Sequence, residues 1–206
     1  KVMKVIFAAV AVFLVSAMAL SAHQMANAQQ ETTEEFIFAN DFNFEKTLES
    51  CASESGQQKN FISPNNPLIT SQAILLMDNG QNDFEKLKSA FDFASKNIDY
   101  KVYGNWRYAS EVLETKSGDC TDKSVLLVSM LEKYGIESYV ITGKKVNDYS
   151  HAWVAAKIDN KWLQIDPTAG DLNFVYDCLA DENCTYHNNY EIESVFNERE
   201  VLKCGN

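Results

Sequence analysis

The chain has 206 residues, of which 46% are hydrophobic, so it is long enough to bury the core of one domain. Its 29 acidic residues outnumber 18 basic ones. The net charge of -11 argues against a nucleic-acid binder, which needs a basic face for phosphates, and against docking on anionic lipid. Three Pro and eight Gly exclude a collagen-like or Pro/Gly-rich disordered protein.

The first 28 residues are typical of a secretory signal peptide. Lys1 and Lys4 precede an apolar run over residues 5–20, and Ala26-Asn27-Ala28 supplies the small residues of a cleavage site. The run is shorter than the roughly 20 residues that a membrane span needs. We therefore predict cleavage after Ala28 and a protein that is secreted or resides in the cell envelope, away from the membrane itself. An uncleaved N-terminal anchor is the alternative.

The rest of the chain predicts helices first and strands later. Residues 29–60 are acidic and polar and are expected to form a loosely ordered leader, with a short aromatic strand around residues 36–44. Apolar spacing and capping signals then predict helices over residues 64–77, 81–97, 110–115 and 120–134. Strands follow at residues 136–142, 150–158 and 161–165, and a weak helix is expected near residues 191–202. This order predicts an α+β domain with an antiparallel sheet.

The five cysteines are Cys51, Cys120, Cys178, Cys184 and Cys204. Disulfides persist in exported proteins, and an odd number of cysteines leaves at least one thiol unpaired. We favour the pairs Cys178–Cys184 and Cys51–Cys204 with a free Cys120, although the other pairings of these four stay open. The alternative is a zinc site formed by Cys178, Cys184, His187 and Cys204, whose ligand types suit zinc but whose spacing lacks a C-x-x-C knuckle.

The two strands over residues 150–158 and 161–165 bring a histidine and an aspartate together. Asp159-Asn160 predicts a tight turn, which pairs Ile158 with Lys161 and places His151 and Asp166 on one face as diagonal neighbours. A carboxylate at that position can hydrogen-bond to the imidazole. Aliphatic residues occupy the opposite face, so this hairpin has a core side and a site side.

Cys120 stands at the first turn of the helix that Asp119 caps, with Asp122 three residues after the cap. Unpaired N–H groups and the helix dipole stabilise a thiolate there, whereas Asp119 and Asp122 oppose it, so a nearby imidazolium is needed. Cys120, His151 and Asp166 together indicate a nucleophilic site. The plainer alternatives are a buried structural cysteine, a structural strand histidine and a strand-ending aspartate.

Three motifs resemble the transglutaminase-like superfamily. Gly118-Asp119-Cys120-Thr121-Asp122 with the following Leu131 and Gly135-Ile136 is similar to its nucleophile helix. His151-Ala152-Trp153-Val154 is similar to its histidine strand, and Lys161-Trp162 with Asp166-Pro167-Thr168 is similar to its aspartate strand. The resemblance covers about residues 80–170 and implies a papain-like α+β core, a nucleophile helix packed on an antiparallel sheet. We assign the domain to residues 61–206, which include a cysteine-containing tail without a counterpart in that family.

The resemblance implies a role for each site residue. Cys120 is expected to be the nucleophile, His151 the base and Asp166 the residue that orients the histidine. The oxyanion hole would use the Cys120 N–H with an upstream donor, Trp106 or Tyr108, and Trp153 is expected beside the site. Neither a metal nor a cofactor is expected there.

These residues predict an exported enzyme that cleaves amide bonds of a peptide or protein through a thioester. Hydrolysis by a peptidase or amidase is favoured, because one small domain offers little surface for two protein substrates. Protein crosslinking with an amine acceptor is the first alternative. A non-catalytic cell-surface binding module with an idle site is the second.

Overall fold

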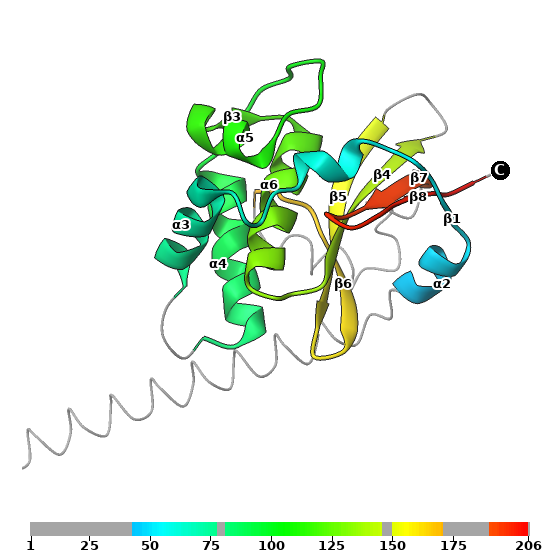
Figure 1. Cartoon of the computed structure of the whole chain (residues 1–206), viewed down its shortest axis with the longest axis horizontal. Helices are drawn as coiled ribbons and strands as arrows, with labels where there is room; N and C mark the ends of the chain where they lie inside the picture. Colours follow the sequence, from blue (N-terminus) through cyan, green and yellow to red (C-terminus); the bar gives the residue numbers. More distant parts are fainter. Residues whose placement is uncertain (1–42, 78–80, 146–149, 171–189, 206) are drawn as a thin grey trace, which may run out of the picture. The chain divides into compact units, whose positions relative to one another are not determined.

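The structure is a computed structural model that describes residues 43–77, 81–145, 150–170 and 190–205 (Figure 1). The predicted signal peptide, most of the predicted leader, residues 78–80 and the cysteines Cys178 and Cys184 fall outside these residues. The described part holds helices and a six-stranded antiparallel sheet, which confirms the predicted α+β class.

The four helices predicted ahead of the strands occur in the predicted order, and a further short helix and a 3₁₀ turn precede them. The helices are α2 (Phe44–Glu49), α3 (Pro67–Leu76), α4 (Asp83–Lys96), α5 (Ala109–Thr115) and α6 (Cys120–Lys133), with a 3₁₀ turn η1 (Gln58–Phe61). Helix α5 begins one residue earlier than predicted, at Ala109, because the Glu111 carboxylate accepts the N–H of Tyr108 at 2.8 Å and fixes the start there. No helix in the described ranges is both long and apolar enough to cross a bilayer.

The large sheet runs in the order β1-β8-β7-β4-β5-β6. Its strands are β1 (Ala52–Ser53), β4 (Ser138–Lys145), β5 (Ser150–Ile158), β6 (Lys161–Ile165), β7 (Tyr190–Phe196) and β8 (Val201–Lys203). A separate two-stranded parallel ladder joins β2 (Asp99–Tyr100) to β3 (Ser117–Gly118). That ladder holds residues 99–100 beside the turn that leads into α6.

Helix α6 is the centre of the core. It packs against β4 and β5 on one side and against α3, α4 and α5 on the other (Figure 1). The sequence predicts one apolar stripe along this helix, yet every residue from Asp122 to Leu131 is buried. A helix enclosed between a sheet and other helices has no solvent face, so even Ser124 and Ser129 lie in the interior.

The opposite face of the sheet has its own apolar layer. Phe44 of α2 is fully buried there, with ring centroids 4.7 Å from Trp162 and 5.5 Å from Tyr139. The Cys51–Cys204 disulfide joins α2's end to the last strand and packs on the same layer, as predicted. The sequence prediction of a loose leader is therefore wrong for residues 43–60, because the apolar side chain of Phe44 and the disulfide attach this segment to the sheet.

The expected helix near residues 191–202 is also wrong, because β7 and β8 form a hairpin there. Its four glutamates and weak apolar spacing favour a helix locally. In the structure β7 pairs with β4 along its length, and Asn197 turns the chain by accepting the N–H groups of Arg199 and Glu200. Pairing with a buried central strand outweighs the local preference.

Candidate active site

Cys120 is the first residue of α6 and is partly buried, with a free thiol. The Asp119 side chain caps the helix by accepting the N–H groups of Thr121 at 3.0 Å and Asp122 at 3.2 Å. Asp122 in turn accepts the N–H of Asp119 at 3.3 Å, which completes the predicted acidic capping box. The N–H of Lys123 bonds to the Asp119 carbonyl at 3.0 Å. The Cys120 N–H is thus the donor of this first turn that has no acceptor among the described residues.

His151 and Asp166 lie on the β5–β6 hairpin with the predicted register. Ile158 pairs with Lys161 and Val154 with Ile165, which confirms a two-residue turn at Asp159-Asn160. Both turn residues have positive φ, 48° and 64°, as a twist-matched hairpin turn requires.

The side chains of this hairpin meet at its open end. His151 Nε2 lies 2.6 Å from Asp166 Oδ2. Asp166 is fully buried, and its other oxygen accepts the N–H and hydroxyl of Thr168 at 2.8 and 2.6 Å. Both carboxylate oxygens are therefore bonded, and the imidazole is held in one orientation.

His151 also forms a side-chain hydrogen bond with Cys120. Because Nε2 faces Asp166, we infer that Nδ1 is the ring nitrogen that serves the cysteine. Burial of the ring lowers its pKa. The hydrogen bonds and negative charges of Asp166 and Cys120 act in the opposite direction and outweigh burial, so the pKa of His151 is raised to about 9. The imidazole is consequently protonated at neutral pH, which suits a thiolate–imidazolium pair.

Aromatic rings surround His151. Trp153 stacks on it with ring centroids 6.1 Å apart, and Tyr190 of β7 lies 5.7 Å away. Trp153 is almost fully buried and its indole N–H donates to Gln164 at 2.8 Å, so Trp153 supports the imidazole and its N–H is already used. Gly143 permits this packing, since a Cβ there would lie 2.8 Å from the Trp153 ring.

Two tyrosines lie within electrostatic reach of the cysteine. The pKa of Tyr100, a largely exposed residue of β2, is raised by partial burial and then by the charges of Cys120, Asp119 and Asp166. The pKa of Tyr190 is raised by burial and by Asp166 and Cys120. Sequence reasoning missed Tyr190 because it precedes a segment interpreted as a helix, whereas the strand alternation of residues 190–196 would have indicated it.

Trp106 and Tyr108 are placed by other contacts. Trp106 stacks on Phe61 at 5.7 Å and meets Phe196 edge-on at 5.4 Å, and Tyr108 lies 5.1 Å from Phe61. The interactions of the described residues include no contact of either side chain with Cys120. Their role as oxyanion donors stays a prediction that this packing does not favour.

Sequence reasoning also missed two buried cations near the nucleophile. Arg107 is 6% exposed and reaches Asp122, and Lys123 is 4% exposed and donates to the Ser95 carbonyl at 3.0 Å. Burial lowers the pKa of Lys123, while the charges of Asp166 and Asp99 raise it in part. For Lys123 the sequence signal is a charged residue at a helix position that the apolar spacing assigns to the interior, whereas Arg107 precedes α5 and carries no such signal.

The disulfide affects the alternative prediction of a zinc site formed by Cys178, Cys184, His187 and Cys204. Cys204 is bonded to Cys51, so it cannot serve as a zinc ligand in this structure. Cys178, Cys184 and His187 fall outside the described residues. In the part of the chain that the structure describes, no three His, Cys, Asp or Glu side chains form a group that could hold a metal ion.

Known proteins resemble this chain in sequence and in fold. Residues 71–167 match the sequence profile of the Transglutaminase-like superfamily. A solved structure of a candidate cysteine protease from Cytophaga hutchinsonii shares the fold, with a TM-score of 0.50 at 15% identity over 74% of this chain and 53% of that chain. LapG of Legionella pneumophila gives a TM-score of 0.42 at 12% identity over 69% of this chain and 88% of that chain.

A curated relative matches a shorter stretch. The centrosomal protein of 76 kDa of Danio rerio is 39% identical over 49 residues, which are 24% of this chain and 7% of that protein. The match therefore spans a small part of the relative, and about half of the Cytophaga chain is covered by the structural likeness. The profile match spans α4 to β6 and includes Cys120, His151 and Asp166, so residues 71–167 belong to the transglutaminase-like superfamily.

Proposed function

We propose that this protein is a cysteine-dependent enzyme that attacks amide bonds of peptides or proteins and forms a thioester. The observation that carries the proposal is the continuous line of hydrogen bonds from Cys120 through His151 to Asp166, with 2.6 Å between His151 Nε2 and Asp166 Oδ2. The raised pKa of His151, about 9, supports a thiolate–imidazolium pair at neutral pH.

Each residue takes one role in the proposed reaction. The Cys120 sulfur attacks the amide carbon, and the carbonyl oxygen becomes an oxyanion that the Cys120 N–H can stabilise. His151 then gives its proton to the leaving amine, and the C–N bond breaks to leave a thioester. Water attacks the thioester carbon and loses a proton to His151, and Cys120 departs as the thiolate. Asp166 orients the imidazole throughout.

Hydrolysis is the proposed outcome of the second step. Cys120 is partly exposed and the His151 side chain is 18% exposed, so water can reach a thioester formed there. An amine could take the place of water, which would make the protein a crosslinking enzyme. The two reactions share every residue and differ only in the acceptor.

We further propose that the protein acts outside the cytoplasm. The Cys51–Cys204 disulfide supports this location, since such bonds persist in oxidising compartments. The signal-like residues 1–28 support it independently.

A pool of internally quenched peptides, incubated with and without dansylcadaverine, tests the activity. Wild type should cleave members of the pool, and Cys120→Ala should cleave none. Incorporation of dansylcadaverine in place of cleavage would assign transfer. A wild type that neither cleaves nor incorporates, and whose thiol reacts with iodoacetamide no faster than a free cysteine, would favour the binding module.

A further inference from the structure

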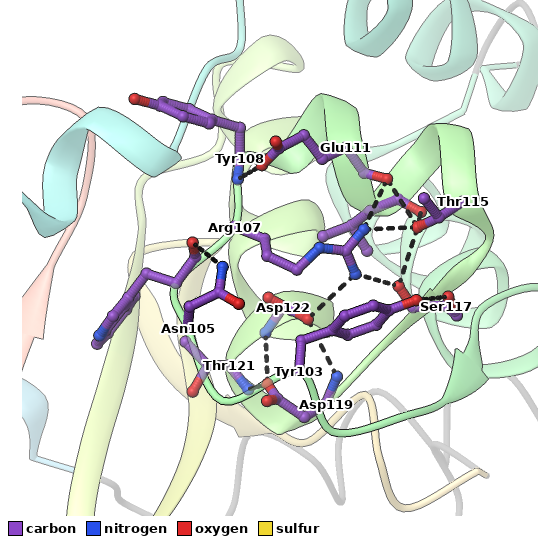
Figure 2. A network of polar contacts seen from close by, with 12 residues as sticks. Tyr103, Asn105, Arg107, Tyr108, Glu111, Thr115, Ser117, Asp119, Thr121 and Asp122 are labelled. Carbon is purple, nitrogen blue, oxygen red and sulfur yellow. Dashed lines mark hydrogen bonds and ion pairs between the residues drawn. The ribbon is translucent and has the colours of Figure 1, made fainter.

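A buried ion pair lies directly beside the proposed nucleophile. Arg107, in the segment before α5, and Asp122, in the first turn of α6, are 6% and 1% exposed. Arg107 Nη1 lies 3.5 Å from Asp122 Oδ2 (Figure 2). Removing two charges from water is costly, and apolar residues of similar volume would stabilise a core as well or better. A buried pair at this position therefore suggests a use other than stability.

Arg107 ties together the segments that lead into the cysteine. Its guanidinium donates to the carbonyl of Ser117 at 2.8 Å, the carbonyl of Glu111 at 3.0 Å and the hydroxyl of Thr115 at 2.6 Å. Figure 2 shows it between α5, which contributes Thr115, and the start of α6. A planar fork with several donors can make all these bonds at once, which a lysine cannot.

A tyrosine covers the guanidinium. The Tyr103 ring centroid lies 3.9 Å from the Arg107 Cζ, and the Tyr103 hydroxyl is 2.6 Å from the Ser117 hydroxyl. The turn at Ser117 is thus held from two sides. Its position matters because Ser117 is three residues before Cys120 and follows Lys116, whose φ is 51°.

Asp122 holds the same turn from the helix side. Its carboxylate accepts the N–H of Asp119, and a Cβ added at Gly118 would lie 2.5 Å from the Asp122 Cβ. The side chain therefore rests against the backbone of residues 118–119. Because Cys120 follows directly, the direction of its N–H depends on how this backbone is held.

The pair also has an electrostatic consequence. Burial and the neighbouring Asp119 charge raise the pKa of Asp122 to about 6, while the Asp119 N–H and Arg107 lower it in part. A carboxylate two residues from Cys120 opposes negative charge on the sulfur and on an oxyanion. Arg107 offsets that effect by placing a positive charge 3.5 Å from the Asp122 carboxylate.

We propose that Arg107 and Asp122 are positioning residues, which hold the turn at residues 117–119 so that the Cys120 N–H points at the oxyanion of the acyl-transfer step. This inference rests on the proposed function. It assigns the pair a role in the chemical step and none in binding the substrate.

Asp122→Asn tests the proposal, with Glu85→Gln as the matched control. Glu85 occupies the same helix position in α4, where its carboxylate accepts the N–H of Asn82 at 3.1 Å, and no described contact links it to Cys120. Turnover of one quenched peptide from the pool gives kcat and KM, and iodoacetamide gives the alkylation rate of Cys120. Alkylation forms no oxyanion, so it reports the thiol without the oxyanion hole.

Asp122→Asn should lower kcat by about 10- to 100-fold, since a misplaced oxyanion donor costs up to about 10³. KM and the alkylation rate should stay within about threefold of wild type, and Glu85→Gln should match wild type in all three. A kcat for Asp122→Asn equal to that of Glu85→Gln would overturn the proposal.

Two further variants keep the proposal falsifiable if Asp122→Asn does not fold. Arg107→Lys keeps the charge and loses the fork, and the double variant Arg107→Met with Asp122→Asn removes both charges. Each should show the same loss of kcat with little change in KM, and full kcat in either folded protein would overturn the proposal. A wild type without turnover would instead overturn the proposed function.

Discussion

Helix α6 carries a carboxyl group with buried oxygens near each end, and the surroundings of the two carboxyl groups differ. Asp122, beside Cys120, accepts a backbone N–H and faces Arg107. Glu132, near the other end, lines a cavity of about 300 Å³ with Glu137, Glu198 and Arg199. Its two oxygens are buried without a partner of good hydrogen-bond geometry among the described residues. Burial and the Glu198 charge raise the pKa of Glu132 to about 7, and the Glu198 N–H and Arg199 offset only part of this.

Because of this difference, changes at the first end should affect the geometry of the active site, and changes at the second end should affect the stability of the fold. At the first end, hydrogen bonds fix the backbone next to the thiol, so changes there should alter chemistry more than folding. At the second end, both carboxyl oxygens are buried and their hydrogen bonds are poor, so changes there should alter folding and leave chemistry intact.

The largest expected effect is at the first end. Cys120→Ala should lower turnover of the peptide pool by about 10⁴-fold or more, because it removes the nucleophile of a unit that acts together. The free energy of unfolding should change by no more than about 1–2 kcal/mol, as a small side chain is exchanged. Turnover assays and urea titration measure the two quantities. A severe loss of stability would identify Cys120 as a structural residue.

A change at a site away from both ends of α6 should affect stability and leave turnover unchanged. Cys51 and Cys204 are 153 residues apart in sequence and lie on the sheet face opposite α6. Replacing both by Ala should lower the free energy of unfolding by about 3–5 kcal/mol, since a long loop is released in the unfolded chain. Urea titration with a matched reduced wild type checks this. A fully folded double variant with strongly reduced turnover would show that the disulfide influences the active site.

Asp166→Asn should lower kcat by about 10- to 10³-fold. The amide can present an N–H where the imidazole N–H needs an acceptor, which favours the wrong tautomer. A cysteine–imidazolium pair depends on such a carboxylate less than a serine does, hence the range. Thr168→Val is the control, because it removes one donor to Asp166 and leaves the carboxylate in place. Unchanged kcat in Asp166→Asn would reduce the site to Cys120 and His151.

The smallest expected effect belongs to the second end. The pKa of Glu132 is about 7 in the folded protein against an ordinary value of 4.5, so the folded state disfavours the charged form. That penalty is fully present above pH 7 and absent below pH 4.5. Glu132→Gln should therefore raise the free energy of unfolding by about 1–3 kcal/mol at pH 8, and the gain should fade as pH falls through this window.

Urea titrations at pH 8 and pH 5 measure this gain, with Glu137→Gln as the control from the same cavity. Turnover should be unchanged in both variants. A stabilisation that is equal at the two pH values, or a loss of turnover, would contradict the contrast between the ends of α6.

Local signals predicted the parts of this molecule that local forces determine. The cap at Asp119 and the turn at Asp159-Asn160 each depend on a few adjacent residues, so they gave the start of α6 and the hairpin register. The register then placed His151 beside Asp166, because side chains alternate along a strand.

Other parts depend on contacts between distant segments, and the sequence alone did not indicate them. Strand β7 exists because it pairs with β4, about 50 residues earlier, and α2 is ordered because Phe44 packs on Trp162 and Tyr139. The Arg107–Asp122 pair joins two segments whose proximity follows from the packing of α5 on α6. Nothing in the spacing of these residues specifies such pairings.

The rate of iodoacetamide alkylation of Cys120 between pH 5 and 9, followed by peptide mass spectrometry in wild type and His151→Gln, tests the central claim most directly. The pKa of His151 is raised to about 9, so an imidazolium faces the Cys120 sulfur at pH 6, and the wild-type thiol should react faster there than the thiol of His151→Gln. His151→Gln should react about 10- to 100-fold more slowly at pH 6, because the cation beside the sulfur is lost. Superimposable profiles for the two proteins would contradict a Cys120–His151 nucleophilic site.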